Sequence, residues 1–90
     1  MKISEKKREK ISEQILLMLY SVSPQAVFTS NIAQEIARDE EFTKKLLIDL
    51  ESKKLVIEIK KNPKGITYLK RSRWKISDAA YQVYKSHQSQ

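Results

Sequence analysis

The residues with the clearest capacity for chemistry are the lysines and arginines between positions 60 and 75. Seven basic side chains and no acidic ones fall in this segment: Lys60, Lys61, Lys64, Lys70, Arg71, Arg73 and Lys75. The rest of the chain holds equal numbers of basic and acidic groups, so the formal net charge of +7 comes from this segment alone. A charge run is often only a solvated surface, but so one-sided a block favours a polyanionic partner. We therefore expect contacts with the phosphate groups of nucleic acid.

Residues suited to catalysis or metal binding are scarce. The sequence has no cysteine, and its one histidine, His87, lies near the C-terminal end. No set of nucleophile, histidine and carboxylate is recognisable, and a chain with one glycine has no glycine-rich phosphate loop. A zinc site needs several His or Cys ligands. We expect no enzyme activity, no metal site and no cofactor, with His87 at the surface.

Hydrophobic periodicity predicts the elements that position the basic segment. A first helix is expected over residues 4–21, with residues 1–10 projecting from the body. Its buried stripe has helical spacing: Ile11, Ile15, Met18, Leu19 and Val22. A short strand is expected at 26–28. Thr29 is then expected to act as the N-cap of a second helix over 30–38.

The central part of the chain predicts a third helix followed by a hairpin. Asp39 is expected to cap a helix over 40–53, with an inner stripe of Thr43, Leu46, Leu47 and Leu50 at helical spacing. Residues 55–60 have strand composition, and the turn Asn-Pro-Lys-Gly at 62–65 reverses the chain. Residues 66–76 are rich in Ile, Thr, Tyr and Trp, and they predict the returning strand.

Ser77 is expected to cap a last helix over 78–87, leaving a disordered tail at 88–90. The inward residues of this helix are expected to be Ala80, Val83 and Tyr84, and Trp74 is expected in the core rather than stacked on bases. The whole chain, 1–90, then forms one domain in the order α-β-α-α-β-β-α. Two short helices followed by a hairpin predict an α+β fold, the winged helix-turn-helix with a two-stranded basic wing.

Three stretches resemble the winged-helix regulators of the MarR-like and PadR-like families. Residues 29–37 (TSNIAQEIA) are similar to their second helix, 46–56 to the end of the recognition helix, and 74–80 (WKISDAA) to the segment that closes the wing. Many members carry glycine where this chain has Lys54 and Ala80. The size is similar to small PadR-like site-binding proteins of archaeal plasmid partition systems. The resemblance implies a winged-helix protein that binds duplex DNA.

The predicted DNA contacts come from three places. If the helix over 40–53 enters the major groove, its outer face carries the residues that reach the bases: Glu41, Lys44, Lys45, Ile48 and Ser52. Thr29 and Ser30, at the start of the second helix, are expected to hold a phosphate, although ordinary capping explains them equally well. The wing is expected to contact the backbone or the minor groove through Lys60, Lys61, Lys64, Lys70, Arg71 and Arg73.

A symmetric homodimer is also expected, because one winged-helix unit reads few base pairs. The run 15–20 is apolar around the whole helix, and tyrosines lie on the last helix. The expected interface residues are Leu16, Leu17, Tyr20, Tyr81 and Tyr84. The alternative, in which the first three pack on Tyr84 within the same chain, stays open.

Two further functions remain open beside a transcriptional regulator. One is a plasmid-partition or architectural DNA-binding protein, with a partition protein or another regulator as partner. The other is a winged-helix module that binds proteins. The longest apolar run, 15–20, is too short to span a bilayer, and the N-terminus lacks the apolar core of a signal peptide. We expect no membrane partner and a cytoplasmic, nucleoid-associated protein.

Overall fold

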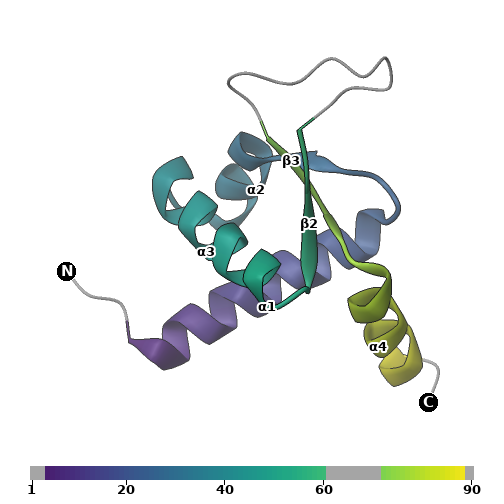
Figure 1. The fold of residues 1–90 in the computed structure, drawn as a ribbon. Helices are drawn as coiled ribbons and strands as arrows, with labels where there is room; N and C mark the ends of the chain where they lie inside the picture. The colour runs from purple at the N-terminus through teal and green to yellow at the C-terminus, as the bar shows by residue number, and fades with distance from the viewer. Residues whose placement is uncertain (1–3, 61–71, 89–90) are drawn as a thin grey trace.

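The computed structural model describes residues 4–60 and 72–88 of the chain. Its elements are α1 (Glu5–Val22), β1 (Val27–Phe28), α2 (Thr29–Ile36), α3 (Glu40–Ser52), β2 (Val56–Ile59), β3 (Arg73–Ile76) and α4 (Asp78–Gln88). This order confirms the predicted α+β fold (Figure 1). The predicted turn at 62–65 and most of the predicted strand over 66–76 lie outside the described residues, as does most of the predicted tail. No helix in the described part of the chain is long and apolar enough to cross a membrane.

The sheet contains three antiparallel strands in the order β1-β3-β2. The short strand β1 therefore joins the hairpin that the sequence predicted, and β3 becomes the central strand. Val27 and Glu58 both lie opposite Trp74, while Phe28 and Ile59 both lie opposite Arg73. Because cross-strand partners share a face of the sheet, Trp74 lies on one face and Arg73 on the other.

Trp74 is at the centre of the hydrophobic core, as the sequence predicted. It is fully buried together with residues from α1, α2, α3 and β2: Ile15, Leu19, Ile32, Leu46, Leu47 and Val56. The predicted stripe of α1 is partly wrong, because Leu16 is buried while Met18 and Val22 are only half-buried. The prediction for α4 is wrong at Val83, which is 56% exposed.

Serine and aspartate side chains start three of the helices. The N–H of Phe42 donates to Asp39 Oδ1 at 2.7 Å, and the N–H of Ala80 donates to Ser77 Oγ at 3.1 Å. Ser4 caps α1 in the same way, which agrees with its predicted start. These caps satisfy N–H groups that the first helical turn leaves without partners. The prediction for Thr29 is wrong, because α2 begins at Thr29 itself and Phe28 occupies the cap position without a side-chain hydrogen bond.

Each of the helices α2 and α3 is followed, within two residues, by a residue in the left-handed conformation. Ala37 has a φ of 57° and Lys54 a φ of 63°. At the second site the N–H of Leu55 donates to the carbonyl oxygen of Leu50 at 3.0 Å, which is the Schellman arrangement. Lys54 therefore occupies the place where glycine is favoured, since a Cβ makes this conformation costly.

Replacing Lys54 with glycine should stabilise the protein by about 1 kcal/mol, because glycine adopts a positive φ without a steric penalty. The matched control is the neighbouring Lys53, whose φ is −89°. Lys53→Gly should destabilise by about 0.5–1 kcal/mol through lost conformational entropy. Urea unfolding measures both changes, and a Lys54→Gly variant less stable than the parent would contradict the assigned conformation.

Candidate nucleic-acid interface

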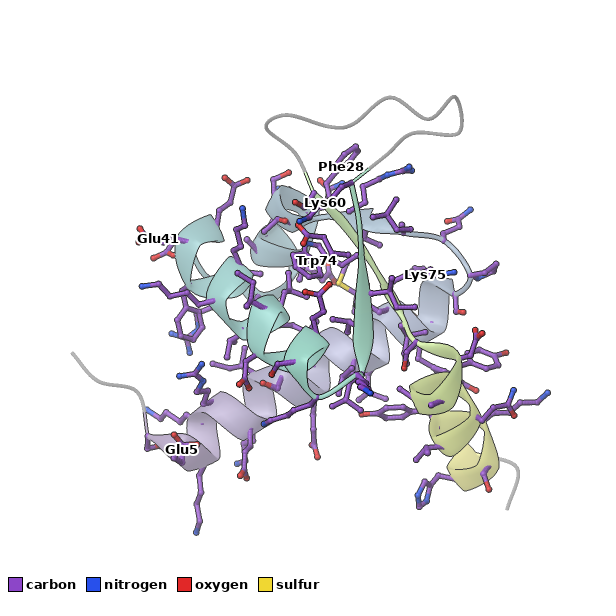
Figure 2. The ribbon with its side chains drawn as sticks, viewed as in Figure 1. Glu5, Phe28, Glu41, Lys60, Trp74 and Lys75 are labelled. Carbon is purple, nitrogen blue, oxygen red and sulfur yellow. The ribbon has the colours of Figure 1, made fainter. Side chains whose placement is uncertain are left out.

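The outer face of α3 is a continuous exposed surface opposite the buried stripe of Thr43, Leu46, Leu47 and Leu50. All of the residues predicted to reach the bases are exposed on it: Glu41, Lys44, Lys45, Ile48 and Ser52. Ile48 is 49% exposed, which leaves an apolar side chain on a mainly polar surface. Figure 2 shows Glu41 pointing away from the body of the molecule. The prediction of an exposed face is therefore confirmed, and the contacts of each residue with DNA stay predictions.

The charges on this face nearly cancel. Lys45 Nζ lies 3.8 Å from Glu41 Oε1, and both side chains are exposed. Glu40 and Glu41 occupy the first turn of α3, where carboxylates interact favourably with the helix dipole. Such an exposed pair contributes little stability, but it reduces the attraction of this helix for phosphates.

A cleft of about 460 Å³ brings together two groups of residues that the sequence placed apart. It lies where the starts of α2 and α3 meet the beginning of β3, and its lining includes Ser30, Glu41, Lys44 and Ser72. Ser30 and Lys44 can both donate hydrogen bonds to an anionic oxygen. The start of α2 and the outer face of α3 thus form one surface.

Thr29 is engaged inside the protein. The indole Nε1–H of Trp74 donates to Thr29 Oγ1 at 2.8 Å, and Thr29 Oγ1 in turn donates to the carbonyl oxygen of Ser72 at 3.3 Å. The backbone N–H of Thr29 donates to the same carbonyl at 3.2 Å. Because both of its donors are used here, Thr29 joins α2 to the sheet, and we leave it out of the phosphate contacts proposed below.

A polar cluster lies at the end of the sheet where β2 ends and β3 begins. The sequence did not predict it. The Glu58 carboxylate is only 12% exposed, and its Oε1 lies 3.7 Å from Lys60 Nζ. It also accepts a hydrogen bond from Ser72 Oγ, and the N–H of Glu58 donates to Glu51 Oε2 on α3 at 3.2 Å. The available signal was an acidic residue between two isoleucines in the predicted strand over 55–60. No local pattern pairs Glu58 with Ser72, because they are 14 residues apart.

The predicted wing residues are only partly described. Lys60 is exposed, as expected. Arg73 is half-buried, and its guanidinium carbon lies 5.9 Å from the centre of the Phe28 ring. Figure 2 shows Phe28 and Lys60 at the same end of the sheet. Four predicted wing residues lie outside the described part: Lys61, Lys64, Lys70 and Arg71.

The predicted dimer residues fall into two groups. Leu16 is buried in the core, and the Tyr20 ring packs on Tyr81 and Tyr84, with ring centroids 5.1 Å and 5.8 Å apart. Packing within the chain, the alternative left open for Leu16 and Tyr20, is therefore what the structure of one chain shows, and the dimer interface stays a prediction. Burial raises the pKa of Tyr84, with a smaller contribution from the Glu13 carboxylate. Leu17 remains 46% exposed on α1.

Comparison with solved structures identifies the fold. A crystal structure of the S. aureus MepR–DNA complex matches with a TM-score of 0.74 and 17% identity, over 93% of this chain and 66% of that one. Lactococcus lactis ZitR, as a mutant in the apo form, matches with a TM-score of 0.70 and 19% identity, over 93% and 58% of the two chains. The chain has the winged helix-turn-helix fold.

A third match is PcaV, a transcriptional regulator from Streptomyces coelicolor solved with its natural ligand, with a TM-score of 0.64 and 14% identity. It covers 82% of this chain and 48% of PcaV, so the winged-helix unit spans between about half and two thirds of these neighbours. No protein-family model matches the sequence, and a comparison with curated protein sequences finds no match. At these identities the likeness establishes the fold.

Proposed function

We propose that the protein binds double-stranded DNA in a sequence-specific way and acts as a transcriptional regulator. The observation that carries the proposal is the single surface formed by the exposed face of α3, the start of α2 and the end of the sheet from which the basic segment extends. Its main element, α3, is an exposed helix of 13 residues, and the major groove of B-DNA admits an α-helix. Two of the structural neighbours support the proposal, a MepR–DNA complex and a protein described as a transcriptional regulator.

In the proposed complex α3 lies in the major groove and the basic segment contacts the backbone or the minor groove. Lys44 donates to guanine O6 or N7, Glu41 accepts from a cytosine amino group, and Ile48 packs on a thymine methyl group. Because α3 holds four acidic and two basic residues, the sequence-independent attraction comes mainly from the segment over 60–75. The protein then works as a cytoplasmic, nucleoid-associated regulator without a cofactor.

Two other functions use the same fold. A plasmid-partition or architectural protein would bind DNA through the same surfaces and differ in where on the genome it binds. A protein-interaction module would not require the charge of the segment over 60–75. Footprinting on the neighbouring DNA distinguishes a transcriptional regulator from a partition protein, because a regulator protects a palindrome at a promoter. Protection that spreads from a cluster of repeats would instead favour partition.

Replacing Lys44 with alanine should weaken binding to the preferred duplex by about 1–3 kcal/mol, with a smaller loss on random DNA, because a base contact is lost. The matched control is Lys85→Ala on α4, which removes the same charge from a helix outside the proposed DNA surface. It should change both affinities only slightly. Fluorescence anisotropy at several salt concentrations measures these constants.

The same titrations test the proposal as a whole. The parent should bind with an affinity that falls steeply with salt, by about a hundredfold or more between 50 and 200 mM. An affinity for duplex DNA that does not depend on salt would contradict the role of the basic segment. Equal losses for Lys44→Ala on both duplexes would show that Lys44 contacts only the backbone.

We further propose that the protein binds a palindrome as a homodimer. The helices α1 and α4 do not belong to the proposed DNA surface. Each of them exposes one large apolar side chain, Leu17 on α1 and Val83 on α4. Beside Val83 lies a groove of about 540 Å³, lined with Leu16, Leu55 and Tyr84 among others. Of the residues predicted from the sequence, Leu17 is retained at the interface, and Val83 is added.

Leu17→Glu or Val83→Glu should shift the protein from dimer to monomer, because a carboxylate is costly to bury in an apolar contact. Light scattering at micromolar concentration measures the mass. Ile57→Glu is the matched control, since Ile57 is an exposed apolar residue on the sheet. A parent that is monomeric yet protects two half-sites would contradict the proposal, as would two glutamate variants as dimeric as the parent.

A further inference from the structure

We propose that Glu58 is a positioning residue, which holds the base of the wing, at Lys60 and Ser72, in place relative to the proposed recognition helix α3. This inference rests on the proposed function, because the wing and α3 must contact the same duplex. It assigns a role to Glu58, which is not among the predicted DNA contacts, through a cluster of Glu51, Glu58, Lys60 and Ser72, with Thr29 and Trp74 behind them. These residues are held together by the hydrogen bonds and the ion pair described above.

The position of Glu58 in the sheet is unusual for an acidic residue. Glu58 lies opposite Trp74, on the face of the sheet that covers the core. Its carboxylate is largely buried, and a buried carboxylate is costly unless donors surround it. Ser72 Oγ donates a hydrogen bond to this carboxylate, and the Lys60 ammonium forms an ion pair with it. An apolar side chain could fill this position without any polar partner. We therefore infer that the carboxylate matters for the contacts that it makes with Ser72 and Lys60, rather than for filling the core.

These two partners of Glu58 lie where the chain leaves and re-enters the sheet. Lys60 directly follows the last residue of β2, and Ser72 directly precedes the first residue of β3. Glu58 therefore ties together the two ends of the segment that carries most of the net charge.

The same cluster is joined to both helices of the helix-turn-helix. The N–H of Glu58 donates to Glu51 Oε2 on α3. The carbonyl oxygen of Ser72 accepts from the hydroxyl and the backbone N–H of Thr29 on α2. A displacement of Glu58 or Ser72 relative to α3 and α2 would break these hydrogen bonds. Lys60 and Ser72, the described ends of the basic segment, are therefore held in place relative to the helix proposed to contact the bases.

A purely structural role predicts a different outcome from a positioning role. Loss of a structural hydrogen bond lowers the free energy of unfolding but leaves the folded protein equally selective. Loss of a positioning contact lowers selectivity at temperatures where the protein is fully folded. The deciding readout is the ratio of affinities for the preferred and the random duplex.

Ser72→Ala removes the hydrogen bond without changing the charge, and Ser12→Ala on α1 is the matched control. We expect Ser72→Ala to lower the affinity for the preferred duplex about tenfold, with a change of less than about twofold on random DNA. Fluorescence anisotropy gives both constants, and circular dichroism confirms folding. Ser12→Ala should leave the ratio of the two affinities unchanged.

Two substitutions of Glu58 separate the hydrogen bond from the charge. Glu58→Gln and Glu58→Ala remove the same negative charge, so both raise the affinity for any DNA equally. Glutamine still bonds to Ser72, and Glu58→Gln should therefore keep the selectivity that Glu58→Ala loses. The double variant Glu58→Ala with Ser72→Ala should lose no more selectivity than Glu58→Ala alone. If Glu58→Ala fails to fold, the ratio of the two affinities is compared between Ser72→Ala and Glu58→Gln instead.

The outcomes separate this inference from the proposed function. A parent that binds the preferred duplex selectively, with Ser72→Ala equally selective, would overturn the positioning role and leave the proposed function intact. A parent that binds no duplex would overturn the proposed function and this inference with it. Loss of selectivity in Ser72→Ala and its retention in Glu58→Gln would support both.

Discussion

The burial of Trp74 is the constraint on which the rest of the structure depends. Its ring is fully enclosed by α1, α2, α3 and β2, and an indole N–H in such a place needs an acceptor. Thr29 Oγ1 is that acceptor, and Thr29 then donates to the Ser72 carbonyl. One aromatic side chain on the central strand thus determines where α2 begins and where β3 begins. Thr29 and Ser72 also line the cleft between the starts of α2 and α3, so this arrangement positions part of the surface proposed to contact DNA.

The proposed DNA surface consists of two parts that differ in charge. The outer face of α3 is almost neutral, because Glu41 and Lys45 form an exposed pair. The segment over 60–75 holds all of the excess positive charge. In the proposed complex α3 adds little sequence-independent affinity, so its contacts with bases weigh more in the choice of site. Under the proposed function, the basic segment supplies the attraction to DNA and α3 discriminates between sequences.

Local signals in the sequence were sufficient to predict the fold and the exposed face of α3. The caps Asp39 and Ser77 were recognisable because capping acts within a few residues along the chain. The stripe of α3 was recognisable because an apolar residue every three or four positions needs no knowledge of its partner. Thr29 was misread for the same reason, since it has the residue type of a cap while its hydroxyl serves Trp74, 45 residues away.

The interactions that the sequence could not predict are long-range. Glu58 and Ser72 meet only because β2 and β3 pair in one particular register, which composition does not determine. The intramolecular contacts of Tyr20 with Tyr81 and Tyr84 depend on how α4 returns to α1. An apolar helix face predicts that something covers it, but whether the cover is the same chain or a second copy is decided by tertiary packing.

The most direct test of DNA binding through α3 and the base of the wing is an NMR titration of the isotope-labelled protein with its preferred duplex. The account predicts that the amide signals of Ser30, Lys44, Ile48 and Ser72 shift together, while that of Ala79 on α4 stays unchanged at the same duplex concentration. Shifts confined to α1 and α4, or no shifts at all, would contradict it.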